Sequence, residues 1–247
     1  MNVKYIDINC DVGEGVANES DLFPFLTSCN VACGGHFGTK ETMKTTVDLA
    51  VKYGVKIGVH PSYPDKENFG RASINISKNA FVNSIKEQIS NFLSVLNEKK
   101  VVLHHIKPHG ALYNDLVKNK ELAQTFLESI LAYKEKALVY SPYNSVIAKE
   151  ALKQGFKVKY EAFADRNYNS DLSLVSRKQK NALISNSKSV LEHISVMLFQ
   201  EKVKVMSGDL VAIQASTFCV HGDSSNTLDI LTYLSKELPK LNILKSV

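Results

Sequence analysis

Residues 5–15 read Tyr-Ile-Asp-Ile-Asn-Cys-Asp-Val-Gly-Glu-Gly. Their alternation predicts a β-strand with Asp7, Asn9 and Asp11 on one side and apolar side chains on the other. Polar groups that face inward are costly unless they bind a ligand or one another. Asp11 and Glu14 flank glycines that allow a ligand to approach closely, so we expect a functional loop at this strand end. The alternative is a strand end whose acids only cap a turn.

The same pattern, a short apolar run that ends in ionisable side chains, recurs along the chain. It is found in ACGGHFG (32–38), GVHPSYPD (58–65), HHIKPHGALYN (104–114), EAFADR (161–166) and CVHGD (219–223). Helical periodicity separates these runs, for example between residues 81 and 96. Strands that alternate with helices favour a parallel sheet covered by helices, and the carboxyl ends of such strands share the face where ligands bind. The ionisable groups are therefore expected to meet at one site.

The candidate strands are Tyr5–Cys10, Asn30–Cys33, Val55–Val59, Val101–Ile106, Ala137–Tyr140, Lys157–Ala162 and Ala215–Val220. About seven strands without a Rossmann glycine fingerprint predict an α/β fold, an irregular seven-stranded (β/α) barrel rather than a doubly wound sheet. Residues 167–186 lack apolar periodicity and are expected to form an excursion near the mouth, and Val203–Val211 a further short strand and turn. The whole chain, 1–247, is expected to form one domain.

The composition excludes several classes of protein. Hydrophobic residues make up 44% and charged residues 22% of the chain, as in ordinary globular proteins. The net charge of +5 comes from scattered lysines, with no basic block among aromatic residues, so no nucleic-acid partner is expected. The sequence shows neither a stretch of membrane-spanning length nor an apolar leader, which predicts a soluble, cytoplasmic protein. The four cysteines form no C-x-x-C pair and are expected to be reduced thiols.

Two loops after predicted strands carry candidate binding residues. His36 lies in the Gly-rich turn Cys33–Gly38, before a helix whose N-terminus can hold an anion. His60 begins a loop stiffened by two prolines, and Arg71 follows with a guanidinium suited to a carboxylate or phosphate. For both histidines a purely structural role is an equally strong interpretation.

The densest polar stretch is His104–Asn114. Lys107 and His109 are two residues apart and share a face if this segment is extended. A confined lysine can stabilise negative charge, and a neutral imidazole can transfer a proton or bind a metal. We expect His104 or His105, in contrast, to point into the core and to bind backbone atoms.

Two later strand ends add further candidates. Asp165 and Arg166 form an acid–base pair, which is either a structural ion pair or, if buried at a sheet edge, the partner of a polar substrate. His221 follows the last predicted strand, whereas Asp223 or Ser224 is expected to be the N-cap of the next helix. The sequence has no G-x-S-x-G or H-E-x-x-H motif, so neither a serine hydrolase elbow nor a zincin helix is predicted.

Together these motifs resemble the LamB/YcsF family, the A subunits of bacterial 5-oxoprolinase. The matching blocks are DINCDVGEG (7–15), NVACGGHFG (30–38), IGVHPSYPD (57–65), FGR (69–71), HIKPHGALYN (105–114), EAFADRNY (161–168) and CVHGD (219–223). They extend over almost the whole chain. The family pattern of the second block is C-G-F-H-A-G-D, and this chain has Gly35 and Thr39 in place of the Phe and Asp.

This resemblance implies a barrel related to the glycoside hydrolase/deacetylase superfamily. It also implies ATP-dependent opening of 5-oxo-L-proline to L-glutamate, together with subunits B and C. Phosphorylation of the lactam oxygen would activate the ring carbon for attack by water, and such a route needs cations for the anionic groups and an acid or base for the ring nitrogen. The sequence contains no nucleotide-binding motif, which favours ATP binding by a partner subunit.

The resemblance also suggests roles for the candidate residues. Lys107 and the two arginines are assigned to anionic groups, Asp11 or His109 to the activation of water, and Asp165 or His221 to the leaving nitrogen. The predicted catalytic residues are Asp11, Lys107, His109, Asp165 and His221, and the predicted substrate-binding residues are Asn9, Glu14, His36, His60, Arg71 and Arg166.

Two alternatives remain open at this point. Related deacetylase barrels bind a divalent metal through an Asp after the first strand and two histidines, which implies Asp11, His60 and His109 here, with His36 as a substitute. The chain would then be a metal-dependent deacetylase or amidohydrolase. In the other alternative it is a non-catalytic binding subunit whose partners perform the chemistry.

Overall fold

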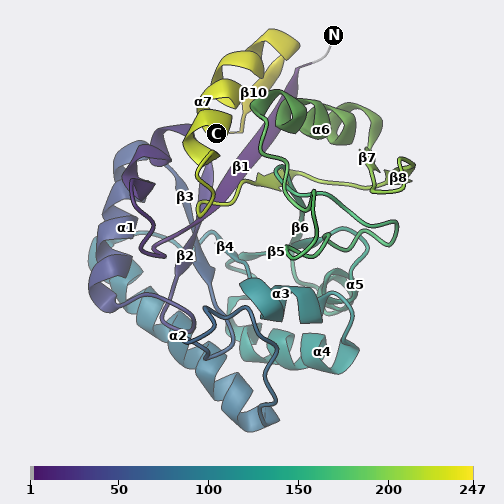
Figure 1. The fold of residues 1–247 in the computed structure, drawn as a ribbon. Helices are drawn as coiled ribbons and strands as arrows, with labels where there is room; N and C mark the ends of the chain where they lie inside the picture. The colour runs from purple at the N-terminus through teal and green to yellow at the C-terminus, as the bar shows by residue number, and fades with distance from the viewer. Residues whose placement is uncertain (1–2, 247) are drawn as a thin grey trace.

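The computed structural model describes residues 3–246 and is centred on a closed barrel of parallel strands (Figure 1). Around the barrel the strands follow the order β1-β2-β3-β4-β5-β6-β9, and β9 pairs again with β1. Their bounds are β1 (Lys4–Val12), β2 (Ser28–Ala32), β3 (Lys56–His60), β4 (His105–Ile106), β5 (Leu138–Pro142), β6 (Val158–Phe163) and β9 (Thr217–Cys219). The predicted irregular seven-stranded barrel is confirmed, and the irregularity is greatest at β4, which has only two residues.

Strand β1 is the longest strand of the barrel and pairs with three others. Its end pairs with β2, its middle with β9, and Lys4–Ile6 with the three-residue strand β10 (Ile243–Lys245). Sequence analysis did not predict β10, because three residues are too few to show a period.

Helices surround the barrel on its outside (Figure 1). They are α1 (Lys40–Tyr53), α2 (Lys78–Lys99), α3 (Gly110–Leu116), α4 (Lys120–Ser129), α5 (Val146–Lys153), α6 (Ser187–Gln200) and α7 (Thr227–Glu237), with short 3-10 turns at Glu19–Asp21, Phe23–Phe25, Leu131–Tyr133 and Pro239–Leu241. Thr39, where the family pattern has Asp, caps α1 by accepting a hydrogen bond from the backbone N of Thr42 at 3.2 Å. Gly54 ends the same helix in the left-handed conformation, with φ of 67°. Among the described residues, no helix has both the length and the apolar character needed to cross a membrane.

The segment 167–186 forms neither a helix nor a strand, as predicted. Isolated bridges such as Arg166 with Leu183 tie it down, and its Arg177 reaches Asp223 beyond β9. Further on, β7 (Lys202–Lys204) and β8 (Leu210–Ala212) form an antiparallel hairpin, where the sequence predicted a single short strand and a turn.

The barrel interior is polar. The predicted alternation in β1 holds, and Asp7 is 1% and Asn9 0% exposed. Asp7 accepts hydrogen bonds from Thr27 and from the Tyr140 hydroxyl at 3.0 Å, and it pairs with Lys159 at 2.8 Å. Burial alone would raise the pKa of Asp7, but the attraction of Lys159 holds it well below its usual range. The buried charge near the amino ends of the strands is therefore compensated.

Candidate active site

Lys107 lies at the centre of the charged groups at the carboxyl ends of the strands. Its Nζ is 2.9 Å from Asp11 Oδ1 and 3.0 Å from Glu161 Oε1, and the residue is only 2% exposed. Burial alone would lower the pKa of Lys107, but the charges of Asp11 and Glu161 hold it well above its usual value. The ammonium group is therefore positively charged and shared between two carboxylates.

Amide and hydroxyl groups fix these two carboxylates. Asn9 Nδ2 donates to Glu161 Oε1 at 2.9 Å, and Tyr113 donates to Glu161 Oε2 at 2.8 Å. Asn30 Nδ2 donates to Asp11 Oδ1 at 2.8 Å. Both polar groups of the Asn9 amide have partners in the protein, because Asn9 Oδ1 accepts from Asn30 at 2.8 Å. Asn9 therefore organises the cluster, in addition to any contact with the predicted substrate.

Four residues of this cluster were not among the predicted site residues, namely Glu161, Tyr113, Asn30 and Cys219. Glu161 was quoted in a motif without a role, and Tyr113 lay in the densest stretch. Cys219 was expected only to be a reduced thiol, but its Sγ lies 3.2 Å from Lys107 Nζ. The alternation in the segment Glu161–Asp165 was the available signal, since it places Glu161, Phe163 and Asp165 on one face.

Three histidines and one acid form a second group beside Asp11. His60 Nε2 lies 3.4 Å from Asp11 Oδ2 and 2.9 Å from His109 Nδ1. Glu14 Oε1 lies 2.9 Å from His36 Nε2 and 3.4 Å from His109 Nδ1. The rings of His36 and His109 stack, with centroids 3.7 Å apart. The structure thus brings together these five predicted site residues.

The donor atoms of this group fit a cation. Ligand atoms of Asp11, His60 and His109 lie within 4.8 Å of one another, and the same holds for Glu14, His36 and His109. Burial, with the charge of His60 next, lowers the pKa of His36 to about 3, and the pKa of His109 is lowered still further. Neutral imidazoles with carboxylates are the ligands that divalent transition metals take. In addition, His36 Nδ1 is buried without a hydrogen-bond partner.

The pKa of Glu14 is raised to about 7, chiefly by burial and then by Asp11. The folded chain therefore binds this proton more tightly than the unfolded chain, where the usual value is 4.5. Glu14 reduces stability progressively as the pH rises from 4.5 through 7, and below that window the cost is absent.

Replacing Glu14 with Gln should remove this cost. In the presence of a chelator, we expect the free energy of unfolding of Glu14→Gln to exceed that of the parent by up to about 3 kcal/mol at pH 8, and by much less at pH 4.5. Urea denaturation at the two pH values measures this difference. If Glu14→Gln changed the free energy of unfolding by the same amount at pH 8 and pH 4.5, the raised pKa of Glu14 would be contradicted.

Asp165 and His221 form a separate pair. Asp165 accepts from the backbone N of His221 at 3.0 Å and lies 2.8 Å from His221 Nδ1. Burial alone would raise the pKa of Asp165, but His221 lowers it below its usual value. The carboxylate thus holds Nδ1, so that Nε2 is the ring nitrogen available for proton transfer.

The predicted anion-binding arginines lie in different surroundings. Arg71, half exposed, pairs with Asp223 at 2.6 Å, and Arg177 pairs with the same carboxylate at 3.0 Å. Arg166 does not join the arginines at Asp223. Its guanidinium donates to the carbonyl oxygens of Val175 at 2.6 Å and Ala182 at 3.4 Å. Its contacts in the structure therefore hold the excursion 167–186.

The prediction of a helix N-cap at Asp223 or Ser224 was wrong. Helix α7 begins three residues later, at Thr227, with Asn226 as its N-cap. The carboxylate of Asp223 is instead held in ion pairs with Arg71 and Arg177.

Comparison with known proteins gives matches over nearly the whole chain. The model of the LamB/YcsF family matches residues 6–245. The A subunit of 5-oxoprolinase from Staphylococcus epidermidis is 36% identical over 248 residues, which cover 98% of each chain. The protein of the same name from Pyrococcus abyssi is 36% identical over 238 residues, covering 94% of this chain and 93% of the relative. The crystal structure of a lactam utilization protein from Thermus thermophilus superposes with a TM-score of 0.91 at 28% identity, covering 98% of each chain.

Proposed function

The chain belongs to the LamB/YcsF family, and from this we propose that it is the A subunit of a 5-oxoprolinase, which opens 5-oxo-L-proline to L-glutamate together with partner subunits. The observation that carries the proposal is the buried Asp11–Lys107–Glu161 cluster beside three histidines at the carboxyl ends of the barrel strands. Barrel enzymes place their catalytic groups at this end. The names of the relatives from Staphylococcus epidermidis and Pyrococcus abyssi supply the substrate class.

Opening of the lactam requires a base, a cation and an acid in the site, as the steps of the reaction show. The oxygen of a water molecule adds to the ring carbonyl carbon, the bond between this carbon and the ring nitrogen breaks, and the nitrogen takes up a proton. A base must therefore receive a proton from water, a cation must stabilise the charge on the carbonyl oxygen, and an acid must serve the nitrogen.

The observed contacts suggest which residue meets each need. Asp11, adjacent to His60, is suited to bind and deprotonate water, and Lys107 supplies the buried positive charge. His221, held by Asp165, is suited to protonate the leaving nitrogen. Arg71 is the cation placed to meet the substrate carboxylate, if the substrate displaces Asp223.

A divalent metal fits the same residues. Asp11, His60 and His109 would hold it, with Glu14 and His36 as the adjacent donors. When bound, such an ion lowers the pKa of water and polarises carbonyl groups. The protein's own part is to keep the imidazoles of His36 and His109 neutral and to orient Asp11 through Asn30 and Lys107.

ATP and the partner subunits complete the proposal. We assign ATP to a partner, because the sequence has no P-loop spacing and no Rossmann glycine pattern. Subunits B and C would then transfer a phosphoryl group from ATP to the lactam oxygen and release ADP. At this chain, water would add to the activated carbon, the bond from this carbon to the ring nitrogen would break, and a second water molecule would cleave the resulting acyl phosphate to glutamate and inorganic phosphate. The second candidate function is a metal-dependent amidohydrolase or deacetylase that acts without partners, and the Asp11–His60–His109 donor set favours it.

One experiment separates these functions. The chain is assayed for glutamate release from 5-oxo-L-proline alone, with subunits B and C, and with B, C and ATP, each with and without a chelator. We expect release only in the complete, ATP-containing mixture. Release by the isolated chain without ATP that stops with the chelator would instead support the amidohydrolase. If subunits B and C release glutamate without this chain, the proposal fails.

A further inference from the structure

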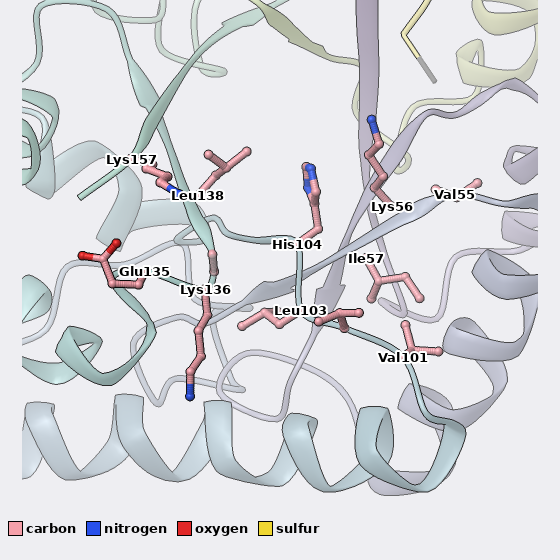
Figure 2. Close-up of a pocket in the computed structure, with 12 residues that line it drawn as sticks. Val55, Lys56, Ile57, Val101, Leu103, His104, Glu135, Lys136, Leu138 and Lys157 are labelled. Atoms are coloured by element: carbon pink, nitrogen blue, oxygen red, sulfur yellow. The ribbon is translucent and has the colours of Figure 1, made fainter. Parts of the chain in front are cut away.

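A series of side chains crosses the barrel interior and ends at Asp11. It begins at His104, which lines a cavity of about 440 Å³ at the amino ends of β3, β4 and β5 (Figure 2). His104 Nδ1 lies 2.9 Å from His105 Nδ1, and His105 Nε2 lies 2.7 Å from Asn30 Oδ1. Asn30 Nδ2 in turn lies 2.8 Å from Asp11 Oδ1. Three hydrogen bonds therefore connect this cavity, at the amino ends of the strands, with the candidate active site at their carboxyl ends.

The direction of each hydrogen bond follows from its chemistry. The Asn30 amide nitrogen faces two oxygens, Asn9 Oδ1 and Asp11 Oδ1, so the Asn30 carbonyl oxygen must face His105. A carbonyl oxygen only accepts, and His105 Nε2 therefore carries the proton. Complete burial lowers the pKa of His105 well below its usual value, so the ring is neutral and its Nδ1 is an acceptor. It follows that His104 Nδ1 donates, and every donor in the series points towards Asp11.

The pocket around His105 is built for an imidazole. The ring is 0% exposed and stacks on Tyr140, with centroids 3.9 Å apart and an interplanar angle of 7°. On the adjacent strand β3, a Cβ at Gly58 would overlap the His105 ring. Glycine at position 58 therefore makes room for the imidazole beside Asn30.

We propose that His105 is a positioning residue, which acts through Asn30 to decide how Asp11 is presented. With Asn30 held in this orientation, Asp11 Oδ1 receives both the Asn30 amide and Lys107, and Asp11 Oδ2 faces His60 at 3.4 Å. Without the proton of His105 Nε2, the buried Asn30 carbonyl oxygen would lose its donor, and the side chain that holds Asp11 Oδ1 would be less firmly fixed. The effect on catalysis rests on the proposed function, whereas the hydrogen-bond directions do not.

The first test measures the proton positions directly. In the chain labelled with nitrogen-15 at histidine, long-range proton–nitrogen spectra report which ring nitrogen carries the proton, and His104→Phe and His105→Phe assign the signals. Between pH 6 and 8 we expect the Nε2–H form for His105 and the Nδ1–H form for His104. A proton on Nδ1 of His105, or a charged ring, overturns the proposal whatever the protein catalyses.

The second test uses the complete, ATP-containing complex. His105→Phe preserves the stacking on Tyr140 but not the donor, and we expect kcat to fall about 10- to 100-fold with KM nearly unchanged. His105→Gln, which can donate to Asn30, should recover most of the loss, and Tyr140→Phe should keep the parental kcat. An unchanged kcat in a folded His105→Phe complex overturns the proposal. If His105→Phe does not fold, the proton positions and the activity of His105→Gln still test the proposal. A parent complex without activity would contradict the proposed function but not the role of His105 in positioning Asn30.

Discussion

The substitution Lys107→Met is expected to reduce glutamate release by the complete complex about 1000-fold. Met has a similar length, so the main change is the loss of a positive charge that lies within 3.0 Å of two carboxylates. Asp11 and Glu161 then repel each other in a buried site, and the free energy of unfolding should fall by roughly 3–5 kcal/mol. Steady-state kinetics and urea denaturation on the same preparation measure the two effects.

Lys159→Met is the matched control for this substitution. Lys159 also pairs with a buried aspartate of β1, with its Nζ 2.8 Å from Asp7, but at the other end of the strand. This variant should lose stability and yet keep its activity at temperatures where it remains folded. If Lys107→Met kept activity within tenfold of the parent while folded, Lys107 would not belong to the active site.

The substitution Asp11→Asn should have the second largest effect, on metal binding and on activity together. Because Asp11 supplies the carboxylate of the Asp11–His60–His109 set, we expect divalent-metal affinity to fall by at least about 100-fold, more than is typical for partners outside the coordination sphere. Activity should fall by at least as much. Elemental analysis of the dialysed chain and titration with Zn²⁺ measure metal affinity. Glutamate release by the complete, ATP-containing complex measures activity.

Asp7→Asn, four residues earlier on β1, controls for the loss of a buried carboxylate. It should lower stability without changing metal content. A parent chain that binds no divalent ion, combined with an inactive Asp11→Asn variant, would assign Asp11 to direct deprotonation of water. Unchanged metal affinity in Asp11→Asn would remove the residue from the proposed metal site.

Sequence analysis predicted the barrel and most of the residues that meet at its mouth. The regular alternation of strands and helices made this possible, because parallel strands necessarily bring their carboxyl ends to one face. Asp11, His60, Lys107 and His109 could each be found from their position directly after, or at the end of, an apolar run. That these residues meet in one cluster could then be predicted without knowledge of their individual contacts.

The interior partners could not be predicted in this way. Glu161 and Asn30 lie within strands, and their importance depends on which strand is opposite, a matter of register that the local sequence does not contain. Asp223 shows the same limit, because its ion pairs come from Arg71 and from Arg177, which lies in a segment without periodicity. Either His104 or His105 was expected to bind backbone atoms in the core. His105 does lie in the core, but its Nε2 contacts the Asn30 side chain.

The pairing of Asp7 with Lys159 has a consequence for the evolution of this barrel. The two residues come from strands far apart in the sequence, and each is costly inside the protein without the other. A change at either position alone would leave an uncompensated charge, whereas a double change to two neutral side chains of similar volume could preserve the fold. We therefore expect substitutions at the two positions to occur together during evolution.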